Sequence, residues 1–380
     1  MILNETSYFG AGCRKELTVE MKKRGMKKAF VVTDKDLVKF NVAKLVLDEL
    51  DSAKIPYEVF DDVQANPTVK NVKAGLELFK KANPDCIIAI GGGSVIDTAK
   101  AIGIISVNPD FSDVVSLEGV ADTKNKSFPV IAFATTSGTA AEVTINYVIT
   151  DENDHRKLVC IDPNDIPVIA FNDAEMLMSM PKGLTAATGM DALTHAIEGY
   201  ITLGAWELSD AICLRSIKLI ADNLEAAVKD GKNAAAREGM ALGSYVAGMA
   251  FSNVGLGIVH SMAHPLGARF NIAHGVANAL LLPYVMEYNK PACVKKYRQI
   301  AEAMNVCTKD MNDEEAADAA INAVKKLSKA INIPEKLSEI KIPEDALKML
   351  SEDAYKDPCT GGNPRKTSPE EILEIYKKAY

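Results

Sequence analysis

The sequence predicts an α/β amino-terminal domain with a parallel sheet, followed by an all-helical carboxyl-terminal domain. Short β-branched segments alternate with amphipathic helical segments in the first half, a pattern typical of parallel strands joined by crossover helices. From about Pro181 the hydrophobic periodicity is helical nearly throughout. The chain has 380 residues, a length that favours two domains. We therefore expect domains at 1–180 and 181–380.

The predicted elements follow one another along the chain. In the first half we expect strands at 27–34, 56–60, 85–90 and 128–134, and helices at 35–52 and 68–82. In the second half the clearest helices are expected at 207–231 and 314–331, where apolar residues recur every three or four positions.

A glycine turn connects the third predicted strand to the helix after it. Gly91, Gly92 and Gly93 let the backbone approach a ligand closely, and free amides at a helix start bind anions. Ser94 and Asp97 form a capping-box pattern there. The turn departs from the GxGxxG fingerprint, because isoleucine stands where the last glycine belongs. It is predicted either to hold a pyrophosphate, as in a Rossmann-like dinucleotide site, or to be a tight turn alone.

Hydroxyl side chains gather at the carboxyl end of the fourth predicted strand. They are Thr135, Thr136, Ser137 and Thr139, and Thr139 forms a second capping pattern with Glu142. Ligands of open α/β sheets bind at this end of the strands. Ligand binding and helix capping alone both explain the cluster.

Asp34 ends the first predicted strand. A carboxylate at this place binds a ribose 2′-hydroxyl and repels a 2′-phosphate, which would select NAD over NADP. The alternative interpretation is that Asp34 caps the following helix.

Four of the five histidines lie in two short stretches of the second half. Asp191 and His195 are four residues apart in a helical segment, so both side chains lie on one face. His260 and His264 share this spacing, although the proline after His264 disfavours helical geometry there, and His274 follows ten residues later. Three imidazoles and a carboxylate can bind a divalent metal. Spacing does not choose among the three later histidines.

Composition excludes several classes of function. The net charge of −8 argues against a nucleic-acid or anionic-membrane partner. No segment approaches the roughly 18 apolar residues of a membrane span, and the first residues do not resemble a signal peptide, so we expect a cytoplasmic protein. The seven cysteines show no CxxC spacing, which favours reduced thiols over a disulfide framework.

Five motifs together resemble the iron-dependent (group III) alcohol dehydrogenases. They are GGGSVIDTAKAIGII (91–105), TTSGTAAEVTINYVITDE (135–152), GMDALTHAIEGYI (189–201), GLGIVHSMAHPLGARFNIAHGVANALLLP (255–283) and CTGGNPR (359–365). The resemblance runs from the first strand to the last helix and implies the dehydroquinate synthase-like architecture of that family. Many members have TTAGTGSE where this chain has TTSGTAAE, so Ser137, Ala140 and Ala141 are local differences that bear on cofactor contacts.

The resemblance also implies the roles of individual residues. It places the metal ligands on Asp191, His195, His260 and His274, and leaves His264 beside the metal as the candidate proton relay. It places NAD contacts on Asp34, Asn66, Gly92, Gly93, Ser94, Thr135, Thr136, Thr139, Asn146 and Lys157. It places the substrate pocket on Asn146, Phe251 and Cys359. The donor set fits Fe(II) or Zn(II), and the resemblance favours iron.

The activity that the resemblance implies is NAD-dependent interconversion of a small aldehyde and its alcohol, first of all lactaldehyde and 1,2-propanediol. Simple primary alcohols such as ethanol, butanol or 1,3-propanediol are the alternative substrates. The family often forms homodimers through its amino-terminal strand. Two alternatives of another class are a dehydroquinate synthase-type lyase and a non-catalytic scaffold that binds NAD and metal.

Overall fold

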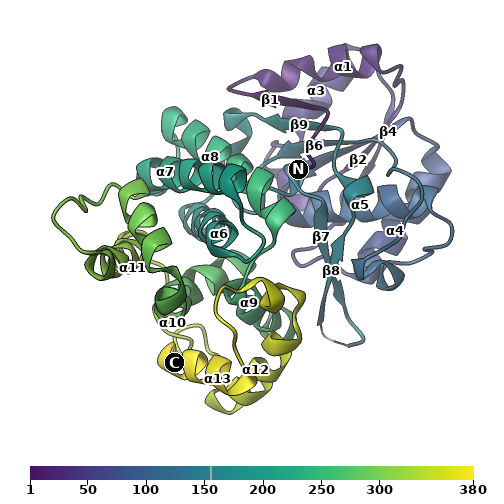
Figure 1. Cartoon of the computed structure of the whole chain (residues 1–380). Coiled ribbons are helices and arrows are strands. Elements are labelled where there is room, and N and C mark those ends of the chain that lie inside the picture. The colour runs from purple at the N-terminus through teal and green to yellow at the C-terminus, as the bar shows by residue number, and fades with distance from the viewer. Residues whose placement is uncertain (155) are drawn as a thin grey trace. The chain divides into compact units, whose positions relative to one another are not determined.

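The computed structural model describes residues 1–154 and 156–380 (Figure 1). It divides into two compact units, Met1–Met180 and Pro181–Tyr380. The first unit is α/β and the second is built of helices, as predicted from the hydrophobic periodicity.

The first unit contains a six-stranded parallel sheet with the strand order β1-β9-β6-β4-β2-β3. The strands are β1 (Thr6–Phe9), β2 (Ala29–Val32), β3 (Tyr57–Phe60), β4 (Cys86–Gly91), β6 (Val130–Ala134) and β9 (Ile169–Asn172). Every residue of β2, β4, β6 and β9 is buried. Such continuous burial is expected of parallel strands that helices cover on both faces.

Helices on the two faces of this sheet produce two apolar cores. Alternate strand residues such as Phe30 and Val32 pack with α4 (Val69–Ala82) and α5 (Gly93–Val107). The strand residues that alternate with these, such as Ala29 and Val31, pack on the other face with α1 (Leu17–Lys23) and α3 (Lys44–Ser52). The period of two along each strand thus distributes the side chains between the two cores.

A separate three-stranded sheet has the order β5-β8-β7, with β5 (Gly119–Val120), β7 (Asn146–Asp151) and β8 (Arg156–Ile161). β7 and β8 pair antiparallel, and β7 alternates between half-buried and buried residues. The sequence analysis did not predict these strands.

The predicted helix at 35–52 is two helices in the structure, α2 (Lys35–Lys39) and α3. Asn41 adopts a left-handed φ of 59° between them and ends the first helix. The predicted helix at 68–82 matches α4, which Thr68 caps by accepting a hydrogen bond from the amide of Asn71.

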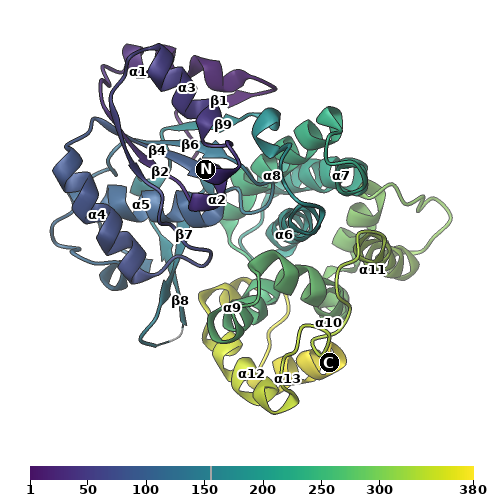
Figure 2. The same ribbon diagram turned by 180° about the vertical axis from the view of Figure 1, so that it is seen from behind.

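The second unit packs its helices around α6 (Lys182–Ile201), which contacts α7 (Glu207–Lys229), α8 (Ala234–Val254) and α10 (His274–Ala303) (Figure 2). The remaining helices are α9 (Ile258–Phe270), α11 (Asp313–Ala330), α12 (Leu347–Lys356) and α13 (Pro369–Lys378). α7 and α11 correspond to the two helices predicted from the sequence.

The expectation that proline would disfavour helical geometry at His264 was wrong. α9 continues through Pro265 to Phe270. Residues 258–267 of this helix are all buried, so tertiary packing compensates for the backbone hydrogen bond that proline removes.

In the described part of the chain no single helix is long and apolar enough to cross a membrane. α8 and α9, bent by 102°, satisfy that length and composition test only when taken as a pair.

Candidate functional site

The second unit brings together the four residues predicted to bind metal. Asp191 and His195 project from one face of α6, His260 comes from α9, and His274 is the first residue of α10. One ligand atom from each lies within 4.8 Å of all the others. The imidazole Nε2 of His274 is 3.6 Å from Oδ1 of Asp191, and the rings of His195 and His260 stack at 4.5 Å.

The chemistry of this cluster suits a divalent cation. Asp191, His195 and His260 are at most 4% exposed, whereas His274 is half-buried. Burial and the neighbouring histidines hold the pKa of His260 well below its usual value. The His260 ring is therefore neutral at pH 7, and a neutral imidazole offers a lone pair to a metal. Nitrogen and carboxylate ligands without thiolate fit Fe(II) as well as Zn(II).

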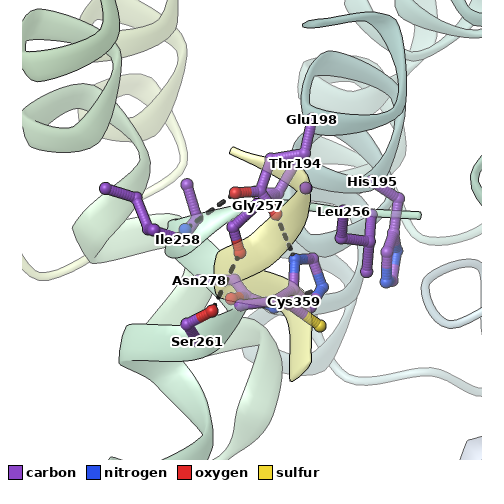
Figure 3. A network of polar contacts seen from close by, with 12 residues as sticks. Thr194, His195, Glu198, Leu256, Gly257, Ile258, Ser261, Asn278 and Cys359 are labelled. Atoms are coloured by element: carbon purple, nitrogen blue, oxygen red, sulfur yellow. Dashed lines mark hydrogen bonds and ion pairs between the residues drawn. The ribbon is translucent and has the colours of Figure 1, made fainter. Parts of the chain in front are cut away.

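Glu198 fixes the orientation of one candidate ligand. Its Oε2 lies 2.6 Å from Nδ1 of His260, and its Oε1 accepts a hydrogen bond of 2.7 Å from the amide of Val259. Figure 3 shows Glu198 within the network of polar contacts around these residues. Burial raises the pKa of Glu198 to about 8, and a cation held by the cluster would lower this pKa by favouring the ionised carboxylate. A hydrogen bond at Nδ1 leaves Nε2 of His260 to face the cluster, the arrangement common for metal-bound histidines.

Asn278 contacts three of the four candidate ligands. Its amide nitrogen donates to Oδ1 of Asp191 at 2.7 Å and lies 3.1 Å from Nε2 of His260 and 3.0 Å from Nε2 of His274. Neither Glu198 nor Asn278 was predicted from the sequence. Helical spacing could have found them, because they follow His195 by three residues and His274 by four.

His264 lies beside the cluster but has a different partner. Its ring centroid is 5.5 Å from that of His274, and its Nδ1 is 2.7 Å from Oδ2 of Asp357. Asp357 precedes the short 3₁₀ helix η7 (Pro358–Gly362), far from α9 in the sequence. Asp357 was not predicted from the sequence, since no local pattern connects it to His264.

Two of the residues predicted to line a substrate pocket also lie near these histidines. The ring of Phe251 stacks on that of His195 at a centroid distance of 4.1 Å. Cys359 groups with His264 and Asp357, each offering an atom within 4.8 Å of the others. Asn146, the third predicted pocket residue, belongs to the first unit, where it begins β7.

In the first unit the glycine turn and the hydroxyl cluster are neighbours, because β4 pairs with β6. A Cβ atom at Gly92 would come within 3.0 Å of Thr136, and one at Gly93 within 2.8 Å of Thr139. The absence of side chains at these glycines lets the threonines of the hydroxyl cluster pack directly against the turn and the start of α5. The amides at the start of a helix are the groups that bind phosphate in dinucleotide sites.

Both predicted capping patterns were wrong. The residue before α5 is Gly92, without a side-chain cap, and Asp97 instead accepts a hydrogen bond of 3.0 Å from the amide of Val148. Ala140, with a left-handed φ of 52°, precedes the 3₁₀ helix Ala141–Val143, and the hydroxyl of Thr139 accepts a long hydrogen bond of 3.4 Å from the amide of Ala141 instead of forming a capping box with Glu142.

Asp34 and Lys157 also have defined partners. Asp34 caps α2 by accepting a hydrogen bond of 2.8 Å from the amide of Leu37. Lys157 donates to Oδ1 of Asn66 at 2.8 Å and to the hydroxyl of Thr150 at 2.9 Å. Burial lowers the pKa of Lys157 to about 8.

A buried lysine missed by the sequence analysis fixes the segment that ends at Asn146. Lys100 is fully buried, and its ammonium group donates to the carbonyl oxygens of Thr144 and Asn146 at 2.6 Å each. It also lies 3.2 Å from the carbonyl oxygen of Ala141. Lys100 thus connects α5 to the loop that leads from the hydroxyl cluster into β7.

Two protein-family models together match almost the whole chain. Residues 4–174 match the model described as iron-containing alcohol dehydrogenase. Residues 185–380 match the carboxyl-terminal part of the Fe-containing alcohol dehydrogenase family.

Individual proteins are similar over their full length. The lactaldehyde reductase of Escherichia coli K12 is 54% identical over 380 residues, covering 100% of this chain and 99% of the relative. The NAD-dependent methanol dehydrogenase of Bacillus methanolicus is 37% identical, covering 98% and 97%. A crystal structure of 1,3-propanediol oxidoreductase superposes with a TM-score of 0.97 at 40% identity, covering 100% and 99%.

Proposed function

The chain belongs to the iron-containing alcohol dehydrogenase family, and from that premise we propose that it is an NAD- and Fe(II)-dependent dehydrogenase that interconverts lactaldehyde and 1,2-propanediol. The observation that carries the proposal is the cluster of Asp191, His195, His260 and His274. The 54% identity to a relative named lactaldehyde reductase supports the choice of substrate.

Each unit has a separate task in this proposal. The second unit would hold Fe(II) through the four clustered side chains. The first unit would hold NAD through the glycine turn and the residues near it, namely Asp34, Asn66, Gly92, Gly93, Ser94, Thr135, Thr136, Thr139, Asn146 and Lys157. When bound, the metal supplies a Lewis acid that polarises the carbonyl group, and NADH supplies the hydride.

His264 supplies the proton in the reductive direction. The reaction takes an aldehyde, NADH and one proton to an alcohol and NAD⁺, so the alcohol oxygen needs a proton donor. An imidazole close to the cluster but hydrogen-bonded to Asp357 is suited to this transfer. Phe251 and Cys359 would contact the substrate, because both lie beside the clustered histidines.

Simple alcohols are the second candidate substrates. The similarity to a structure named 1,3-propanediol oxidoreductase supports 1,3-propanediol, and the relative named methanol dehydrogenase supports other primary alcohols. A dehydroquinate synthase-type lyase would return the hydride to its substrate within one turnover, and a scaffold protein would transfer no hydride. Neither alternative would show net consumption of NADH with an aldehyde.

We further propose a cytoplasmic homodimer that associates through β1. This strand is at one edge of the six-stranded sheet, and an edge strand offers backbone groups to a second chain. Analytical ultracentrifugation of the full chain would measure the association.

The deciding experiment is an anaerobic assay of NADH oxidation with lactaldehyde, propanal, acetaldehyde and 3-hydroxypropanal, with metal content measured on the same sample. We expect the highest kcat/KM with lactaldehyde in iron-containing protein. A higher value with 3-hydroxypropanal would favour 1,3-propanediol as the product. No NADH consumption with any aldehyde would contradict the proposed function.

A further inference from the structure

We infer that Asp357 is a positioning residue that holds His264 in the tautomer required for proton transfer. Oδ2 of Asp357 lies 2.7 Å from Nδ1 of His264, and both side chains are 9% exposed. The inference rests on the proposed function, in which His264 transfers a proton to or from the alcohol oxygen.

The hydrogen bond defines which ring nitrogen carries the proton. An ionised carboxylate only accepts hydrogen bonds, so Nδ1 of His264 must be the donor. Burial by itself would raise the pKa of Asp357, but the interactions with His264 and with the amide of Cys359 leave that pKa lowered. With Nδ1 protonated, Nε2 is the ring atom that accepts the transferred proton in the neutral imidazole and releases it from the imidazolium.

The carboxylate is held rigidly by the segment around it. Oδ1 of Asp357 accepts a hydrogen bond of 2.9 Å from the amide of Cys359, which leaves Oδ2 for His264. Two amide hydrogen bonds of 2.8 and 2.9 Å between Asn363 and Asn289 attach the end of η7 to α10. The position of Asp357 therefore does not depend on its contact with His264.

The same geometry argues against a second cation site at His264, Asp357 and Cys359. The distance of 2.7 Å between Nδ1 of His264 and Oδ2 of Asp357 is that of a charge-assisted hydrogen bond. In the metal cluster, by contrast, Nε2 of His274 and Oδ1 of Asp191 are 3.6 Å apart, beyond a hydrogen bond. A cation between His264 and Asp357 would have to break their hydrogen bond.

The proton step balances without a proton on Asp357. In aldehyde reduction, bound NADH would supply the hydride for the C–H bond, which leaves the former carbonyl oxygen with an electron pair that needs a proton. The O–H bond forms with the proton on Nε2 of the His264 imidazolium, whose N–H electron pair stays on Nε2. A proton from bulk solvent then binds Nε2 and restores the imidazolium, which accounts for the one proton consumed in each turnover. Asp357 remains ionised throughout and stabilises the imidazolium, as the aspartate of a hydrolase triad does.

The first test is a double-mutant cycle in the iron-containing enzyme. Asp357→Asn preserves the shape and the capping ability of the side chain, but it removes the charge and allows the wrong tautomer. We expect kcat to fall on the order of 10- to 100-fold, with metal content and aldehyde KM unchanged. Asp353→Asn, at a more exposed carboxylate paired with Arg269, is the control and should leave kcat unchanged.

Coupling between the two residues is the critical measurement. In a His264→Ala background, Asp357→Asn should cause no further loss, because it acts only through the ring. An equal loss of kcat in both backgrounds would overturn the inference.

The second test observes the tautomer directly. The chain has five histidines, so ¹⁵N-histidine labelling of Zn(II)-loaded protein gives a small set of imidazole signals, and His264→Ala assigns the one of interest. We expect protonated Nδ1 in the wild type and a changed Nδ1 signal in Asp357→Asn. An unchanged signal would overturn the inference. This result does not depend on turnover, whereas absence of NADH oxidation by the wild type would contradict the proposed function instead.

Discussion

Oε2 of Glu198 lies 2.6 Å from Nδ1 of His260, and both side chains are 2% exposed. This carboxylate-imidazole pair sits one helical turn from the pair formed by Asp357 and His264. Two histidines on one face of α9 are thus each held at Nδ1 by a carboxylate from another part of the second unit. The first pair orients a candidate metal ligand, and the second orients the candidate proton relay.

The role of Glu198 predicts an effect on metal affinity. Glu198→Gln should weaken Fe(II) binding by about 10- to 100-fold, because the neutral amide no longer fixes the tautomer of His260 or increases its basicity. Competition with a coloured chelator measures the affinity. Glu225→Gln changes an exposed carboxylate on α7 that pairs with Lys229, and it should leave the affinity unchanged. Equal Fe(II) affinity in the Glu198 variant and the wild type would show that Glu198 does not support metal binding through His260.

The three later histidines should separate by role when each is replaced by alanine. His260→Ala and His274→Ala each remove a metal ligand, so metal occupancy and activity should fall together. His264→Ala should keep its metal and lose on the order of 10² to 10⁴ in kcat, the usual range for general acid–base catalysis. Elemental analysis beside steady-state kinetics tests this. Metal-free His264→Ala protein together with metal-containing His274→Ala protein would show that His264 is the ligand.

The identity of the metal predicts redox sensitivity. If the cluster holds Fe(II), activity should decline on chelation or aerobic storage, because oxygen oxidises the ion. Adding Fe(II) under reducing conditions should restore it. Parallel samples reconstituted with Zn(II) alone provide the comparison, and full activity in those samples would show that iron is not required.

Asp34 should determine the choice between NADH and NADPH. Asp34→Asn preserves the helix cap at α2 but removes the charge that repels a 2′-phosphate. We expect the ratio of kcat/KM for NADPH over NADH to rise by about ten-fold or more. Asp36→Asn, at an exposed position of the same helix, is the matched control. A ratio that stays the same in the Asp34 variant would leave Asp34 with its capping role alone.

The lowered pKa of Lys157 predicts that cofactor affinity depends on pH. Burial lowers the pKa of this side chain to about 8, so it is a cation below that pH and neutral above it. NADH carries a negative pyrophosphate, so its affinity should fall as the pH rises through about 8, by roughly ten-fold. Fluorescence titration with NADH measures the affinity. The profile should persist in Lys124→Gln, which changes an exposed lysine, and disappear in Lys157→Met.

The sequence by itself determined the order of the two halves and part of the site. Hydrophobic patterning is a local property, so the alternation of β-branched and helical segments in the first half and the helical period in the second predicted a parallel α/β unit followed by helices. Spacing also brought Asp191 and His195 to one face of a helix, because residues four apart are neighbours there. The resemblance of five motifs to a known family supplied the remaining residue roles.

Only the tertiary structure showed which contacts separate His264 from His260 and His274. Spacing left the three equivalent and the family resemblance assigned their roles, but the fold brings Asp357, 93 residues away, to Nδ1 of His264. It also decided that Asp97 bonds to β7 instead of capping α5, and that α9 continues through a proline. These outcomes depend on packing between segments distant in the chain, where burial and hydrogen bonding outweigh the local preferences that a sequence pattern records.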